Sequence, residues 1–213
     1  VIGGGNFVPS FGFTISDNWF AVLNNDSVLP QMIVGRLPIN TVDELTRYGD
    51  KVKNNFENSF NDWNKKYLFF SSGRGTEGEL KVLKNVNDTV INKYVEHAPV
   101  GGKVTHFYKT IKPQTDFGPY TPQQFNSAID EGAVVIPYLG HSGTATWDNG
   151  INEINQLKNK VNRNPLILDF GCSTNKFGEP DIVSFGERFI LKNDGQAIGY
   201  IGNSSLGFLS TAL

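Results

Sequence analysis

The sequence is poor in cysteine, and this scarcity limits what the chain can do. Its 213 residues hold a single cysteine, Cys172, so an internal disulfide framework and a multi-cysteine zinc site are both excluded. A lone free cysteine is in most proteins a small buried hydrophobe, but it can also be a nucleophile. The sequence around Cys172 therefore has to show which of these two roles applies.

The sequence also lacks a strong charge of either sign and a long apolar run. The net charge is -2 and no basic face stands out, so nucleic acid is not expected as a partner. No apolar run approaches the roughly 20 residues that cross a bilayer, and we expect no transmembrane segment in this chain. A hydrophobic content of 38% is ordinary for a folded globular protein.

The chain opens on Val1-Ile2-Gly3-Gly4-Gly5, which reads as the end of a buried strand and not as a targeting sequence. These glycines lack the G-x-G-x-x-G spacing of a phosphate-binding loop, so a close turn after a strand is the better interpretation. We expect residues 1–213 to form one catalytic domain cut from a longer protein, with any amino-terminal subdomain and targeting sequence outside this chain.

Short apolar runs alternate with amphipathic stretches along the chain. The apolar runs lack clean alternation, which is typical of strands buried on both faces of a parallel sheet. The expected strands cover residues 1–4, 67–71, 103–108, 133–139, 166–170 and 197–201. Five helices are expected. One begins after Thr41 and another at Thr121-Pro122, and the other three cover residues 78–95, 151–161 and 183–191. The pattern predicts an α/β fold with a doubly wound, mostly parallel sheet and helices on both faces.

Two reactive residues each follow a predicted strand directly. Residues 133–139 lead into Gly140-His141-Ser142-Gly143, and residues 166–170 lead into Gly171-Cys172-Ser173-Thr174. In an open α/β sheet, ligands bind beyond the carboxyl ends of the strands. If the two strands are adjacent, His141 and Cys172 therefore open onto the same edge of the sheet.

This arrangement suits thiol-based acyl transfer. A nearby histidine helps a thiol to become the thiolate that attacks a carbonyl, and it can then protonate the leaving amine. Backbone N–H groups at Ser142 and Cys172 would form an oxyanion hole. The alternative is that His141 and Cys172 are unrelated loop residues.

Ser142 offers a rival interpretation. The stretch Gly140-His141-Ser142-Gly143-Thr144 nearly matches the G-x-S-x-G turn that carries the nucleophile of α/β-hydrolases. However, Thr144 replaces the last glycine, and no histidine follows Ser142 as the order of that triad requires. We interpret Ser142 as a backbone contributor and keep an esterase that uses its hydroxyl as a third hypothesis.

Motifs along nearly the whole chain resemble the gingipain family of clostripain- and caspase-related cysteine peptidases. They lie at residues 1–4, 16–20, 33–39, 41–45 with Lys51, 138–143 with Trp147, 170–174, 184–187 and 197–202. The resemblance implies a caspase-like fold, with His141 as the base and Cys172 as the nucleophile. It thus implies a cysteine endopeptidase that acts on a peptide or protein substrate.

Some motifs are similar to the signal-peptidase branch that serves the type IX secretion system. They are Pro9-Ser10-Phe11-Gly12, the order His141-Ser142, and residues 195–200. That branch cleaves carboxyl-terminal sorting domains from secreted cargo and can join the new end to a surface anchor. The resemblance implies a secreted or outer membrane-associated bacterial protein, a sortase-like transpeptidase as the alternative activity, and type IX secretion components as partners.

A catalytically silent relative that binds peptide or acts as a scaffold is the second hypothesis.

The chain departs from the gingipain pattern at two places. Ser142 stands where the family usually has glycine, and Gly73-Arg74 stand where a glutamate that orients the histidine is expected. Glu77 and Glu79, slightly further on, are the candidates for that role. Trp147 is expected to pack in the interior, and it is also a candidate for lining the substrate cleft.

The resemblance also implies structural calcium, although the chemistry itself requires no cofactor. Asp17 and Asp26 are the candidate ligands, and the alternative that we favour is an ion-pair network with Arg36.

Four further polar residues are expected to have structural roles. His97 and His106 do not follow strand ends and are not expected to be catalytic. Asp169 lies in an otherwise apolar strand, where a buried carboxylate needs hydrogen-bond partners. Glu187 is expected to cap or brace a loop.

Overall fold

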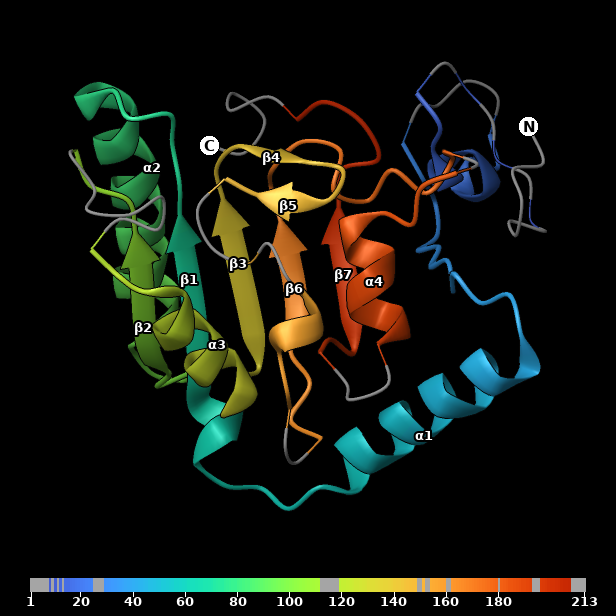
Figure 1. Ribbon diagram of the computed structural model, residues 1–213, viewed down its shortest axis with the longest axis horizontal. Coiled ribbons are helices and arrows are strands. Elements are labelled where there is room, and N and C mark those ends of the chain that lie inside the picture. The colour runs from blue at the N-terminus through green and yellow to red at the C-terminus, as the bar shows by residue number, and fades with distance from the viewer. Residues whose placement is uncertain are drawn as a thin grey trace.

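A central parallel sheet organises the computed structural model, which describes residues 8, 10, 12, 14–24, 29–111, 119–148, 151, 154–159, 162–179, 181–192 and 196–207. The sheet has the strand order β2-β1-β3-β6-β7, and all four pairings are parallel (Figure 1). Its strands are β1 (Lys66–Ser71), β2 (Lys103–Tyr108), β3 (Val135–Leu139), β6 (Leu166–Asp169) and β7 (Gly199–Gly202). The predicted strands at these places are confirmed to within two residues, and the one predicted at residues 1–4 lies outside the described residues.

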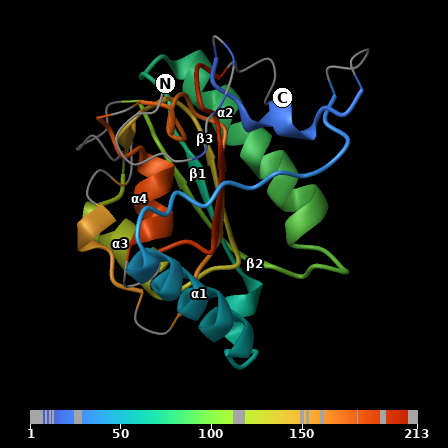
Figure 2. The ribbon, with the colours of Figure 1, turned by 90° about the vertical axis from the view of Figure 1, so that its right-hand side faces the viewer.

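Helices lie on both faces of the sheet, as the sequence predicts. Figure 2 shows α2 (Glu77–Val90) on one face, and α1 (Val42–Glu57), α3 (Pro122–Asp130) and α4 (Phe185–Leu191) on the other. A π-helical turn, Ile91–Val95, continues α2, so the predicted helix at 78–95 changes its geometry in its last turn. Among the described residues, none of the helices has the length and apolarity to cross a membrane.

Aromatic side chains fill the larger core, between the sheet and helices α3 and α4. Phe70 of β1 packs against Phe125 of α3 with ring centroids 5.5 Å apart. Phe185 and Phe189 of α4 lie 5.1 Å apart, and both contact Trp147. These rings are almost completely buried. They fix the sheet, and with it the strand ends, in one position.

The predicted helix at 151–161 is wrong. In the described part of this segment, the helical structure is one short 3-10 turn, Ile154–Gln156. Ile151, Ile154 and Leu157 are all buried in the main core. Their spacing of three suggests a helix, but it equally suits a 3-10 turn with irregular flanks, which has three residues per turn. The apolar pattern thus predicted correctly that these three side chains are buried, but the α-helix that it suggested is not formed.

Helix α1 brings one buried polar side chain to the rest of the molecule. It begins with a capping box, in which the N–H of Glu44 donates to Thr41 at 3.2 Å and the N–H of Thr41 donates to Glu44 at 3.1 Å. Its one buried side chain is Lys51, whose ammonium donates to the carbonyl of Ile190 at 2.5 Å. That carbonyl lies in the last turn of α4, where a helix carries partial negative charge.

Lys51 makes the stability of the fold depend on pH. Burial, reinforced by the nearby charge of Lys192, lowers the pKa of Lys51 from 10.5 to about 8. Above pH 8 the unfolded chain therefore holds a proton that the folded chain has lost, and the free energy of unfolding gains up to about 1.4 kcal/mol per pH unit from this residue.

We expect Lys51→Met to remove this gain in the free energy of unfolding. Denaturant unfolding of both proteins from pH 8 towards 10.5 tests it, and parallel pH profiles would contradict it.

Candidate active site

His141 and Cys172 lie beyond the ends of adjacent strands. Strands β3 and β6 pair directly, with Tyr138 opposite Asp169. His141 and Cys172 each come three residues after this pair, so the condition for a shared edge is met. A short hairpin, β4 (Ser142–Gly143) and β5 (Thr146–Trp147), follows His141 at once and closes over this edge of the sheet (Figure 1).

Glu79 orients the imidazole of His141. Its Oε1 lies 2.6 Å from Nε2 of His141, and its Oε2 accepts the N–H of Arg74 at 2.8 Å. Glu79 stands in the first turn of α2, directly after the loop that follows β1. Glu77 is exposed, and the described contacts of His141 do not include it. Of the two candidates, the structure therefore brings only Glu79 to the histidine.

The surroundings of Glu79 keep it ionised. Burial alone would raise the pKa of this carboxyl, but the N–H of Arg74 and the ring of His141 lower it by more, so the net shift is downward. A carboxylate at Nε2 favours the tautomer of His141 that carries its proton on that nitrogen.

Buried groups hold the backbone of His141. The hydroxyl of Tyr138 donates to the carbonyl of His141, and the N–H of Asp148 donates to the same carbonyl at 3.0 Å. Gly140 is needed just before, because a Cβ there would lie 2.3 Å from the Cβ of Ser72. Tyr138 gave no sign of this role in the sequence, where it reads as one more apolar strand residue.

One buried carboxylate holds the cysteine loop. Oδ1 of Asp169 accepts the N–H of Gly171 at 2.7 Å. Its Oδ2 accepts Nε1–H of Trp147 at 2.7 Å and the hydroxyl of Tyr200. The expected structural hydrogen bonds of Asp169 are thus confirmed. They also tie the loop of Cys172 to the hairpin that follows His141.

Trp147 does not line a substrate cleft. Its exposed fraction is 1%, and its ring stacks on Tyr138 with the centroids 4.3 Å apart and the planes 7° from parallel. The expectation that it packs in the interior is confirmed, and the cleft assignment is wrong. Proximity in sequence to His141 was misleading because the hairpin turns this side chain inward to Asp169.

The side chain of Ser142 links the two reactive loops. Its hydroxyl donates to the carbonyl of Cys172 at 2.9 Å. A Cβ on Gly171 would lie only 2.0 Å from this hydroxyl, so the contact depends on that glycine. A nucleophilic serine would donate to an imidazole nitrogen instead, and the geometry therefore gives no support to the esterase hypothesis.

The sequence profile of peptidase family C25 matches residues 1–212. The chain belongs to peptidase family C25. The resemblance to gingipain-type cysteine peptidases noted in the sequence is thus confirmed.

Three solved structures share the fold of this C25 chain. A structure described as a protease has a TM-score of 0.76 at 19% identity, over 92% of this chain and 41% of its own. The arginine-specific cysteine proteinase gingipain R has a TM-score of 0.73 at 18% identity, over 94% and 47%. A complex of the pro- and mature domains of Porphyromonas gingivalis RgpB has a TM-score of 0.68 at 17% identity, over 95% and 47%. The caspase-like fold is thereby confirmed.

The C25 chain spans less than half the length of these three structures. No curated protein sequence matches it.

Asp17 of the C25 chain is engaged by an arginine. Its two carboxylate oxygens accept Nε and a terminal nitrogen of Arg36, each at 2.7 Å. The guanidinium also lies 4.6 Å from the ring centroid of Phe177. The favoured ion pair with Arg36 is confirmed for Asp17, and Asp26 lies outside the described residues. The part of the chain that the structure describes holds no cluster of three side chains suited to a metal.

The remaining polar candidates have structural roles. The carboxylate of Glu187 accepts the N–H of Ser184 at 2.7 Å and braces the start of α4. The ring of His106 bridges Ser71 at 2.8 Å and Asp88 at 3.0 Å. This order resembles a hydrolytic triad, but Ser71 is only 2% exposed and cannot meet a substrate. His97 lies in an exposed turn.

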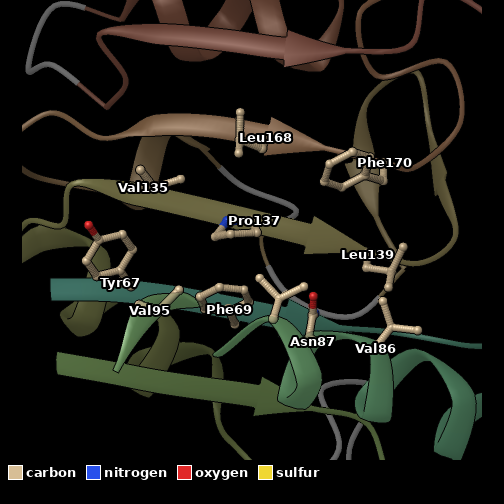
Figure 3. Close-up of a pocket in the computed structure, with 11 residues that line it drawn as sticks. Tyr67, Phe69, Val86, Asn87, Val95, Val135, Pro137, Leu139, Leu168 and Phe170 are labelled. Carbon is tan, nitrogen blue, oxygen red and sulfur yellow. The ribbon is translucent and has the colours of Figure 1, made fainter. Parts of the chain in front are cut away.

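An apolar cavity of about 280 Å³ lies on the α2 side of the sheet, away from the hairpin. Figure 3 shows its walls, which are side chains of α2, of the π-helical turn after it, and of strands β1, β3 and β6 with Phe170 after β6. Asn87 and Tyr67 are its polar lining residues, and the amide of Asn87 already donates to the carbonyl of Phe70 at 3.1 Å and to Ser71 at 2.8 Å. This cavity therefore offers no reactive group.

Replacing Glu79 tests its role in orienting the histidine of this C25 site. We expect Glu79→Ala to lower kcat for peptide hydrolysis by roughly 100-fold, the lower end of what general acid-base catalysis contributes. KM should change little, because the imidazole is misplaced and the substrate contacts are not. Glu77→Ala is the matched control, two residues away in the same helical turn, and should behave like the wild type. Equal effects of the two changes would contradict the assignment.

Proposed function

We propose that this C25 chain is the catalytic part of a cysteine endopeptidase in which His141 and Cys172 form the reactive dyad. The observation that carries the proposal is the Glu79–His141 contact, at the end of a strand that pairs with the strand leading to Cys172. The hydrogen bond from Ser142 to the carbonyl of Cys172 supports it, because it couples the two loops directly. Cys172 itself is only partly buried, and a nucleophile has to be accessible.

The reaction begins when Nδ1 of His141 takes the proton of the Cys172 thiol. The thiolate attacks the substrate carbonyl, a C–S bond forms, and the electron pair of the C=O bond moves to oxygen. Backbone N–H groups of Cys172 and Ser142 stabilise that oxyanion. When the tetrahedral intermediate collapses, the C–N bond breaks, and the imidazolium of His141 gives its proton to the departing amine. A thioester on Cys172 remains.

The group that attacks the thioester decides the outcome. If water attacks, His141 takes its proton, the C–S bond breaks, and a carboxylic acid and the free thiol are released. If an amine attacks instead, the same step forms a new peptide bond, which is the sortase-like alternative. The thiolate and the imidazole supply the nucleophile and the proton carrier in both cases, so the chemistry requires no cofactor.

The finer setting of this activity is also a proposal. The motifs shared with the signal-peptidase branch, such as Pro9-Ser10-Phe11-Gly12, favour a role in processing secreted proteins through the type IX system. That role would place the protein outside the cell or at the outer membrane of a bacterium, with secreted proteins as substrates and secretion components as partners. Cleavage of a purified sorting domain, followed by mass spectrometry of the products, tests it and separates hydrolysis from transpeptidation.

The reactivity of the Cys172 thiol tests the dyad. A free thiol is only about 3% thiolate at pH 7, so activation by a histidine can speed alkylation several-fold to roughly 30-fold. We expect iodoacetamide to modify Cys172 about 10-fold faster than free cysteine at pH 7, and His141→Ala to abolish this advantage. His97→Ala, which alters an exposed turn, is the matched control and should keep it.

Two results would overturn the proposal in different directions. A Cys172 that reacts like free cysteine and ignores the His141 change would favour the silent peptide-binding or scaffold relative. Turnover of small esters that survives Cys172→Ala and is lost in Ser142→Ala would favour the esterase.

A further inference from the structure

Protein groups hold most of the backbone of the cysteine loop, residues 171–173. Four polar backbone groups of residues 171–173 have partners from four different residues. These bonds join Gly171 N–H to Asp169 at 2.7 Å, Gly171 C=O to Asn203 at 2.8 Å, Cys172 C=O to Ser142 at 2.9 Å, and Ser173 N–H to the carbonyl of Ser205 at 2.7 Å. Within the part of the chain that the structure describes, the N–H of Cys172 has no such partner. It belongs to the same residue as the thiol and is the donor that the proposed oxyanion hole requires.

The contact with Asn203 determines where that N–H points. Nδ2 of Asn203 donates to the carbonyl of Gly171, which belongs to the same peptide group as the N–H of Cys172. This peptide is trans, so its C=O and N–H lie in one plane and point in opposite directions. An amide that holds the oxygen on one side therefore aims the N–H to the other side, and the peptide cannot rotate without breaking the 2.8 Å bond.

Asn203 is itself firmly placed. It follows β7, whose last residue Gly202 pairs with Asp169 at the end of β6. Its carbonyl accepts the N–H of Asn175 at 3.0 Å, so its backbone cannot drift from the cysteine loop. Gly207 covers the contact closely, because a Cβ there would lie 2.6 Å from Nδ2 of Asn203 and 3.2 Å from the carbonyl of Gly171. The amide is thus confined between two backbone segments.

We propose that Asn203 is a positioning residue for the oxyanion hole. Through the carbonyl of Gly171, its amide keeps the N–H of Cys172 aimed at the oxygen that becomes negative in the transition state. This role rests on the proposed peptidase function. Pre-aligned donors contribute because no reorganisation is needed when the charge develops, and loss of one donor typically costs 10²- to 10³-fold in kcat. Misaiming a donor costs less than removing it, so we expect a loss of roughly 10- to 100-fold.

The decisive test compares processes that place an oxygen in the proposed oxyanion hole with one that does not. Peptide hydrolysis and the binding of a peptide aldehyde both make the carbonyl carbon tetrahedral and bring its oxygen to the hole, whereas iodoacetamide reacts with the thiolate at a saturated carbon. In Asn203→Ala and Asn203→Asp we expect kcat and aldehyde affinity to fall by the same roughly 10- to 100-fold, with KM within about 2-fold. The alkylation rate of Cys172 should equal that of the wild type.

Ser204→Ala is the matched control. The hydroxyl of Ser204 donates to the carbonyl of Ile15 at 2.6 Å and makes no hydrogen bond to the cysteine loop, so its loss should leave kcat, aldehyde affinity and alkylation unchanged. Asn203→Asp keeps the volume of the side chain but presents only acceptors at neutral pH. Thermal unfolding of each variant shows whether the fold survives.

Three outcomes would overturn this role. The first is a wild-type kcat in both Asn203 variants. The second is an equal loss of alkylation and hydrolysis, or unfolding of both variants, since either means that Asn203 merely supports the loop. The third is a wild-type thiol that reacts like free cysteine and ignores His141, which would overturn the peptidase function and this role with it.

Discussion

The carboxylate of Asp169 is the point on which the rest of the site depends. A buried carboxylate is costly unless donors surround it. Here the donors come from three segments: the N–H of Gly171, the indole of Trp147 and the hydroxyl of Tyr200. Satisfying one buried charge therefore joins the cysteine loop, the hairpin after His141 and strand β7. The same indole stacks on Tyr138, whose hydroxyl donates to the carbonyl of His141. The position of the His141 backbone therefore depends on the packing of these two aromatic rings.

The histidine is approached from the opposite face of the sheet. Helix α2, which lies on that face in Figure 2, brings Glu79 to His141, whereas the contacts of Asp169 face the larger core. The buried bonds of Asn87 to Phe70 and Ser71 fix α2 against β1 and thereby fix the approach of Glu79. Groups from both sides of the sheet thus position His141 and the loop of Cys172, the proposed dyad.

The sequence predicted the features that depend on local order along the chain. His141 and Cys172 were found because a residue directly after a parallel strand must lie at the carboxyl edge. The choice between Glu77 and Glu79 was not predictable, because it depends on the rotation of α2 about its axis. The cleft assignment of Trp147 was wrong because the direction of its side chain depends on the β4–β5 hairpin, which turns the indole inward to Asp169. Asn203 carried no signal, since its partner Gly171 is 32 residues away and the bond uses only an amide and a backbone carbonyl.

The departure at Ser142 is best understood together with Gly171. A glycine after the histidine leaves room beside the cysteine loop, and a serine there fills that room with a hydroxyl. The hydroxyl fits because Gly171 has no side chain, and it then holds the carbonyl of Cys172 at 2.9 Å. The serine occupies the acceptor side of Cys172 and does not engage the N–H of that residue, which is the donor of the proposed oxyanion hole. A side chain in place of the family's glycine is therefore compatible with an oxyanion hole.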